Sequence, residues 1–125
     1  MATYKPGVCN IGKNEIRKRY ALGVVGFVAT LILVYFLVEF SAPRLSLVAC
    51  IIPLFLGSEG MYQGYFRFCA GFATLRAFDF SGSGGRRGKV AGEKAHKLDL
   101  QQALKINLYS LDTAAILTLL IYIFV

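Results

Sequence analysis

The sequence predicts an all-α integral membrane protein that crosses the bilayer three times. Its 125 residues are 56% hydrophobic and only 17% charged, whereas a soluble chain of this size typically carries ~25% charged residues. The mean hydropathy is +0.57, and the apolar residues form long blocks that do not follow a helix or strand period. We therefore expect a single membrane domain over residues 1–125, and neither a disulfide scaffold nor a multidomain enzyme.

The first predicted span covers residues 20–40. Its 21 residues contain one charge, Glu39, close to the end. A bilayer core of ~30 Å requires about 20 helical residues, so the length fits. The block is longer than the ~7–15 apolar residues of a signal peptide, and Pro43 spoils the cleavage site that would follow it. We therefore expect a retained anchor preceded by a cytoplasmic segment, residues 1–19.

The second predicted span covers residues 45–66. Pro53 removes a backbone donor inside it, which predicts a kinked helix. The turn before it, Ser41–Arg44, is so short that spans one and two should form an antiparallel hairpin. Small residues allow helices to approach closely, within one chain or between copies. The expected packing glycines are Gly23, Gly26, Gly57, Gly60 and Gly64.

The third predicted span covers residues 106–125. Asp99 and Gln102 have the spacing of a capping box, which places the start of this helix near Leu100. Between spans two and three, residues 67–78 read as an interfacial helix lying on its aromatic face. Residues 79–98 then read as a flexible basic loop. Its expected contacts to anionic lipid are Arg86, Arg87 and Lys89.

The distribution of Lys and Arg predicts the orientation. Five lie in residues 1–19, eight lie in residues 67–105, and only Arg44 lies elsewhere. Three spans place those thirteen on one side, so the N-terminus should be cytoplasmic and the C-terminus outside. Topology and attraction to anionic lipid thus account for most of the net charge of +7, so this charge is only weak evidence for a nucleic-acid partner.

Two acids stand where a charge is costly. Glu59 lies in the second span and Asp112 in the third, at similar expected depths. Intramembrane acids usually face the protein interior or a wet cavity. The candidate polar site for ions, protons or helix packing comprises Glu59, Gln63, Asn107 and Asp112. In the alternative interpretation, each acid has a local partner: Lys105 for Glu59, and Tyr109 or Ser110 for Asp112.

The sequence predicts no cofactor, metal site or enzymatic activity. The single histidine, His96, falls in the predicted polar loop, and no span contains one. This argues against haem ligation, a histidine proton relay or a catalytic triad within the membrane. Cys9, Cys50 and Cys69 have no recognised metal-ligand spacing, so we expect thiols that bind no metal.

Several short segments carry a resemblance to a known group of proteins. They are Cys9-Asn10-Ile11-Gly12, Glu15-Ile16, Arg17–Arg19, Gln63 and Arg67-Phe68-Cys69. This pattern resembles small uncharacterised bacterial inner-membrane proteins and the short membrane domains that accompany some rhodanese modules. The resemblance implies a multi-pass protein of the bacterial inner membrane and assigns no catalytic residue.

Three functions are consistent with these features. The first is a non-enzymatic accessory or scaffold subunit that associates with copies of itself or with a larger membrane complex. The second is an oligomeric proton or cation channel or transporter subunit that uses Glu59 and Asp112. The third is a peripheral role in which the basic loop recruits anionic lipid, nucleotide or RNA.

Overall fold

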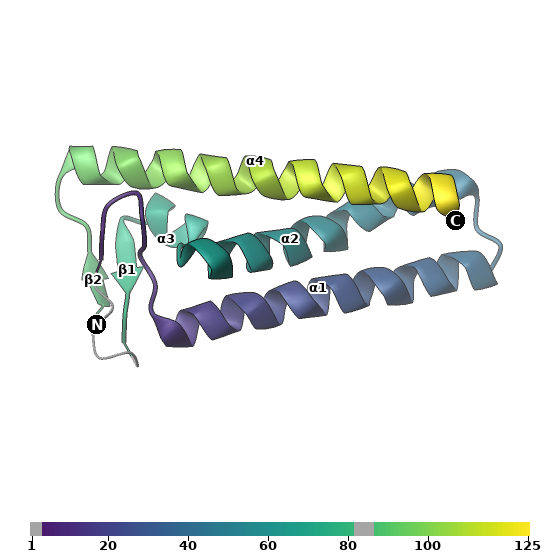
Figure 1. The fold of residues 1–125 in the computed structure, drawn as a ribbon, viewed down its shortest axis with the longest axis horizontal. Helices are drawn as coiled ribbons and strands as arrows, with labels where there is room; N and C mark the ends of the chain where they lie inside the picture. The colour runs from purple at the N-terminus through teal and green to yellow at the C-terminus, as the bar shows by residue number, and fades with distance from the viewer. Residues whose placement is uncertain (1–3, 82–86) are drawn as a thin grey trace.

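Three long helices run side by side, and a cap of short elements closes one end of the molecule (Figure 1). The computed structural model describes residues 4–81 and 87–125. The described chain begins in the cap, where Tyr4 stacks on Phe78, and the C-terminus lies at the opposite end. Three helical segments, Lys13–Glu39, Arg44–Phe66 and Glu93–Phe124, are long and apolar enough to cross a membrane. The prediction of a mostly helical chain with three candidate spans is therefore confirmed.

Helix α1 covers Lys13–Glu39 and starts directly at the cap. The N–H of Gly12 donates to the carbonyl of Asp79, 2.9 Å away, which fixes the entry of the chain into the helix. In the first turn, Glu15 forms ion pairs with Lys18 at 3.1 Å and Arg19 at 3.3 Å. A negative charge here interacts favourably with the positive end of the helix dipole, and the ion pairs at i+3 and i+4 stabilise the first turn of the helix.

The second candidate span consists of two kinds of helix. Residues Arg44–Cys50 form a 3-10 helix, η1, and Ile51–Phe66 form the α-helix α2. Pro53 falls in the first turn of α2, where its missing N–H removes no helical hydrogen bond. The irregularity predicted at Pro53 is therefore a change from 3-10 to α geometry, located just before the proline.

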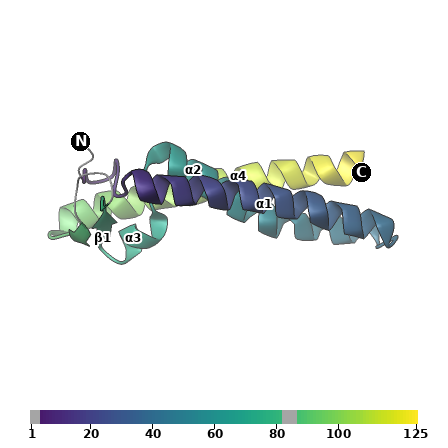
Figure 2. The same cartoon turned by 90° about the horizontal axis from the view of Figure 1, so that it is seen from below.

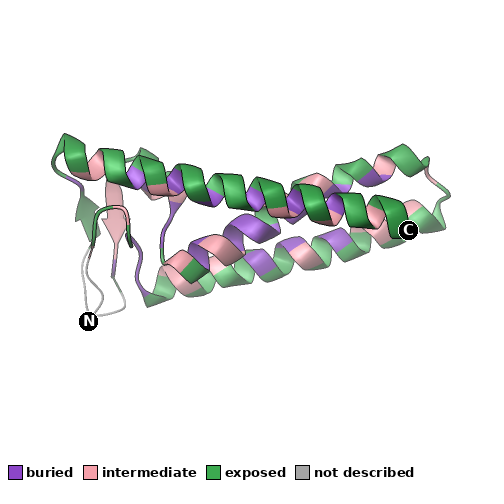
Figure 3. Cartoon of the chain, turned by 45° about the horizontal axis from the view of Figure 1, so that its top comes forward, coloured by how far each residue is buried: buried purple, intermediate pink, exposed green. Residues whose placement is uncertain are grey.

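Helix α2 lies between α1 and α4, which spans Glu93–Phe124 (Figures 1 and 2). It packs against both, whereas α1 and α4 share no extended contact within the described residues. At the end opposite the cap, side chains of all three segments, among them Phe27 of α1 and Leu117 of α4, pack on a core of Cys50, Leu54 and Ala114. Buried residues follow α2 and the inner faces of its neighbours, and the outer faces are exposed (Figure 3).

The cap replaces the interfacial helix predicted over residues 67–78. Helix α2 ends at Phe66 because Arg67 adopts a left-handed conformation, φ 55° and ψ 44°. The N–H of Phe68 then donates to the carbonyl of Gln63 at 3.0 Å, as in a helix C-cap. A five-residue helix, α3 (Ala70–Thr74), and strand β1 (Ala77–Asp79) follow, with β1 antiparallel to β2 (Arg87–Lys89).

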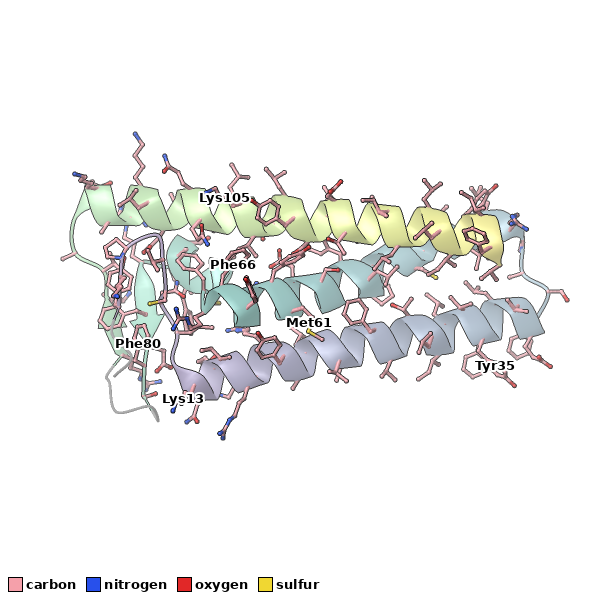
Figure 4. All side chains as sticks on the ribbon, viewed as in Figure 1. Lys13, Tyr35, Met61, Phe66, Phe80 and Lys105 are labelled. Atoms are coloured by element: carbon pink, nitrogen blue, oxygen red, sulfur yellow. The ribbon has the colours of Figure 1, made fainter. Side chains whose placement is uncertain are left out.

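The aromatic side chains of this region fill the core of the cap. Phe68 and Phe80 are fully buried, and Phe80 lies at the capped end in Figure 4. Phe68 packs in a core with Ala73 and with Ala103 and Ile106 of α4. The N-terminal segment joins the cap through Ile11, which pairs with Asp79 as a parallel bridge. Phe68 was expected to lie on the membrane surface as part of an aromatic face. It is instead covered by residues that lie far from it in the sequence.

Helix α4 begins at Glu93, not near Leu100 as predicted. Asp99 is not an N-cap, because it is fully buried inside the helix and accepts hydrogen bonds from the N-terminal segment. The predicted flexible loop, residues 79–98, is correspondingly shorter. Its residues 82–86 lie outside the described residues, whereas β2 and the first turns of α4, including His96, occupy part of the remainder.

Candidate functional site

The middle of α2 carries a buried polar cluster that faces α4. Glu59 and Gln63 stand one turn apart and are only 7% and 8% exposed. The side-chain Nε2 of Gln63 donates to Glu59 Oε2 at 2.5 Å. The amide of Asn107 on α4 also faces this carboxylate. Because a carboxylate only accepts hydrogen bonds, we assign the amide nitrogen to this side, 2.6 Å from Oε1 and 3.3 Å from Oε2. Three of the four predicted site residues thus meet.

The carboxylate of Glu59 is held by two neutral amides. Among residues 4–81 and 87–125, the ion pairs involve other acids, Glu15 and Glu93, and no Lys or Arg nitrogen approaches Glu59 within 4 Å. Lys105, the partner considered from the sequence, is exposed on α4. Glu59 therefore has hydrogen-bond donors but no counter-cation within the part of the chain that the structure describes.

Gln63 leaves one hydrogen-bonding atom unused. Because the Glu59 carboxylate can only accept hydrogen bonds, the amide nitrogen of Gln63 must face it. The amide oxygen, Oε1, is then buried without a partner in the described structure. A buried acceptor without a donor costs free energy of about 1–3 kcal/mol, so this atom calls for an explanation.

Asp112, the fourth predicted residue, lies elsewhere. It is exposed on the surface of α4, and no described residue makes a hydrogen bond or ion pair with it. Its two proposed local partners are otherwise placed: Ser110 is fully buried, and the ring of Tyr109 packs against Tyr62 and Phe66 at centroid distances of 5.9 and 6.3 Å. The two acids therefore do not share a cavity.

An open groove of about 710 Å³ lies beside the polar cluster. Glu59, Gln63 and Asn107 supply its polar wall. The rest of the lining is aliphatic or aromatic and comes from all three long helices: Leu22, Ile51, Ile52, Phe55, Leu56, Leu108 and Leu111. No Lys, Arg or His contributes to it. The groove thus combines an apolar surface with hydrogen-bond acceptors at one side.

Glycines set the distance between α1 and α2. A Cβ atom built on Gly26 would stand 2.5 Å from the Cα of Gly57, and one on Gly60 would stand 2.5 Å from the backbone of Gly23. Gly64 meets the ring of Tyr20 in the same contact. Figure 4 shows Met61 on the α1 side of α2 and Phe66 on the α4 side. All five predicted packing glycines therefore face the partner helix within the same chain.

The cap joins the two halves of the sequence pattern noted above. The side chain of Asn10, which is fully buried, donates from Nδ2 to the carbonyl of Cys69 at 3.0 Å. Its Oδ1 accepts from the N–H of Cys69 at 2.6 Å. The backbone N–H of Asn10 donates to the carbonyl of Arg67 at 3.1 Å. The segments 9–12 and 67–69 are thus paired structural parts of the cap.

Asp99 ties the start of the chain to α4. It accepts hydrogen bonds from the Tyr4 hydroxyl at 2.5 Å and from the Gly7 N–H at 2.7 Å. Burial, followed by the hydrogen bond to Asp99 and the charge of that acid, raises the pKa of Tyr4. On β1, hydrogen bonds from Ser81 lower the pKa of Asp79. The hydrogen bonds behind these two pKa shifts, Tyr4 to Asp99 and Ser81 to Asp79, stabilise the cap.

The remaining predicted residues occupy separate places. Arg87 and Lys89 are exposed on β2, and Arg86 lies outside the described residues. Cys9 and Cys69 are buried in the cap, whereas Cys50 is buried between the long helices. Within residues 4–81 and 87–125, no group of three or more His, Cys, Asp and Glu side chains has the arrangement of a metal site.

The sequence did not predict the roles of Asn10 and Asp99 or the apolar lining of the groove. Asn10 carried a signal, since it lies in the pattern on which the resemblance rests. The sequence around Asp99 was misleading, because its spacing to Gln102 is the same as that of a capping box.

Comparison of the chain with known protein families, curated proteins and solved structures finds no match.

Proposed function

We propose that the chain is a non-enzymatic membrane-embedded subunit that joins a membrane assembly through the outer face of α4. One observation carries this proposal: Asp112 is exposed on a helix that is long and apolar enough to span the bilayer. It lies 12 residues before Phe124, or about 18 Å along the helix. An unpaired charge at such a depth costs on the order of 2.5–3.5 kcal/mol, so a partner should supply a hydrogen-bond donor there.

The contrast with α1 supports the same conclusion. The middle of α1 exposes only apolar side chains, among them Val25, Val28, Leu31 and Ile32, as a surface in contact with lipid requires. The outer face of α4, in contrast, carries two charged side chains, Lys105 and Asp112. We therefore assign α1 to lipid and α4 to a neighbouring protein helix, either of another polypeptide or of a second copy.

The proposal includes an orientation and a location. The basic residues gather at the capped end, and the one basic residue at the opposite end, Arg44, is engaged with the last turn of α4. The positive-inside rule then places the cap in the cytoplasm and the C-terminus outside. The cell membrane, specifically the bacterial inner membrane that the resemblance implies, is the proposed location, with Arg87 and Lys89 at its anionic lipids.

Native mass spectrometry of the particle extracted in mild detergent from its host tests this function. The wild-type chain should appear with other polypeptides or as several copies. Asp112→Leu, which removes the charge and the acceptor, should reduce the assembled fraction about tenfold or more, because a hydrogen bond to a charged group contributes about 1.5–3 kcal/mol. Asp112→Asn should have an intermediate effect.

The matched control is Glu39→Gln, which also removes one exposed acid but does so at the end of α1. This variant should assemble like the wild type. A wild-type chain that is found only as a monomer would contradict the proposal. So would a normal assembled fraction for Asp112→Leu.

A further inference from the structure

We propose that the groove beside Glu59 binds a lipophilic ammonium ion, that is, a protonated amine carried on a hydrocarbon body. Asp112 does not line this groove, so the inference stands independently of the docking proposed for α4. It is carried by three features that coincide: an apolar groove, a buried carboxylate without a counter-cation, and a buried amide oxygen without a donor in the described structure.

The size and lining of the groove fit a small amphiphile. Its volume of about 710 Å³ falls within the ~300–1,000 Å³ typical of small-molecule sites, which are mostly apolar with a few placed polar groups. The wall formed by Phe55, Leu56, Leu108 and Leu111 would accept a hydrocarbon chain. The acyl chain of a bilayer lipid could also pack against this wall, so selectivity for one ligand over lipid must come from the polar side of the groove.

The polar side selects a donor with positive charge. Both Glu59 oxygens accept hydrogen bonds from neutral amides, and the carboxylate retains its negative charge when ionised. Gln63 Oε1 is a second acceptor, more than nine-tenths buried and unpaired in the described structure. An ammonium group has three donors and one positive charge, so a single head group can satisfy the amide oxygen and neutralise the acid.

The same features disfavour other occupants. An anionic head group would meet the Glu59 carboxylate and no basic residue, since the lining contains none. Phosphatidylethanolamine carries an ammonium group, but it would bring a phosphate to the same place. Glu59 also stands seven residues before Phe66, the end of α2, which is about 10 Å along the helix and deeper than a phospholipid head group lies. An amine without phosphate therefore fits best.

Equilibrium binding of radiolabelled dodecylamine tests the site. The full chain is placed in phosphatidylcholine nanodiscs, and empty nanodiscs supply the baseline for partition into lipid. At neutral pH this amine is protonated, as the lysine side chain is with its pKa of about 10.4. We expect saturable binding of about one amine per chain. Dodecanol and dodecyltrimethylammonium should each bind at least tenfold more weakly, because the first lacks the charge and the second lacks donors.

Two variants separate the polar and apolar parts of the site. Glu59→Gln keeps the shape of the side chain and removes its charge, so dodecylamine affinity should fall at least tenfold. Leu108→Trp fills the groove from an exposed position and leaves the polar cluster intact, so it should weaken dodecylamine and dodecanol alike. Glu39→Gln, the matched removal of an acid outside the groove, should bind like the wild type.

Four results would overturn the inference. They are the absence of saturable binding to the wild type, equal affinity for the amine and the alcohol, unchanged affinity in Glu59→Gln, and displacement of dodecylamine by phosphatidylethanolamine added to the discs. The last result would assign the site to a lipid head group. None of these measurements depends on whether α4 has a protein partner, so the inference and the proposed function can fail separately.

Discussion

At the scale of single residues, Asn10 is the side chain that connects the start of the chain to the end of α2. Replacement by Ala would leave the N–H of Cys69 without a partner in a buried place, whereas the carbonyl of Cys69 would keep the hydrogen bond from the Ala73 N–H. A buried donor without a partner costs about 1–3 kcal/mol, so Asn10→Ala should destabilise the cap by about that amount. Amide hydrogen exchange in detergent micelles should become faster at residues 4–12 and 67–69.

The control for this prediction is Asn14→Ala. Asn14 is exposed in the first turn of α1, so its replacement should leave exchange in the cap unchanged. The prediction fails if Asn10→Ala exchanges at the wild-type rate in both segments. That outcome would mean that the apolar core around Phe68 and Phe80 holds the cap without this pair of hydrogen bonds.

The polar cluster shows how far residue-level prediction can go. The i, i+4 spacing of Glu59 and Gln63 already places them on one face, and the depth argument brought in Asn107. Asp112 was grouped with them on depth alone. Five residues separate it from Asn107, a rotation of about 140° around an α-helix, so the two cannot face the same neighbour. Depth along a helix therefore predicts a shared site only when helical phase agrees with it.

At the scale of elements, the close packing of α1 on α2 depends on glycine backbone contacts. A Cβ on Gly60 would stand 2.5 Å from the carbonyl oxygen of Arg19 and 2.5 Å from the nitrogen of Gly23. Backbone cannot move aside as a flexible side chain does. Gly60→Ala should therefore force the helices apart and lower the free energy of unfolding by about 1–3 kcal/mol, measured by loss of helical circular dichroism during titration with dodecyl sulfate.

Gly71→Ala adds the same methyl group where there is room, since the nearest side-chain atom, Cys69 Sγ, would be 3.7 Å away. This control should unfold at the wild-type dodecyl sulfate concentration. Equal stability of the two variants would show that α1 and α2 can separate slightly at little cost.

The elements differ in how well the sequence predicted them. The glycine spacing and the short turn predicted the α1–α2 hairpin, because both signals are local. The cap was not predicted, because its order depends on pairing between distant segments: residues 9–12 with 67–69 and 79. The aromatic spacing after Phe66 looked amphipathic, but Phe68 is buried against Ala103 and Ile106 of α4, which lie far from it in the sequence.

At the scale of the whole molecule, the arrangement of the three long helices connects the two proposals. Because α1 and α4 share no extended contact in the described residues, a groove remains beside α2 and the outer face of α4 stays uncovered. The glycine contacts already fully engage α1 with α2. The surfaces available for function are thus the groove beside Glu59 and the face around Asp112.

The charge asymmetry between the two ends predicts how the molecule sits in the membrane. Thirteen of the 14 Lys and Arg residues fall within residues 1–19 and 67–105 of the sequence, and Arg44 is bound to the carbonyls of Tyr122 and Ile123 at the end opposite the cap. Labelling with a membrane-impermeant maleimide tests the orientation. In intact cells, a cysteine at Ser41, in the exposed turn after α1, should react at once, whereas one at Lys97, exposed on the capped end of α4, should react only after permeabilisation. The wild-type chain, whose three cysteines are all buried, provides the baseline. The reverse labelling pattern would place the cap outside the cell, and it would also show that the basic residues have a role other than setting the topology.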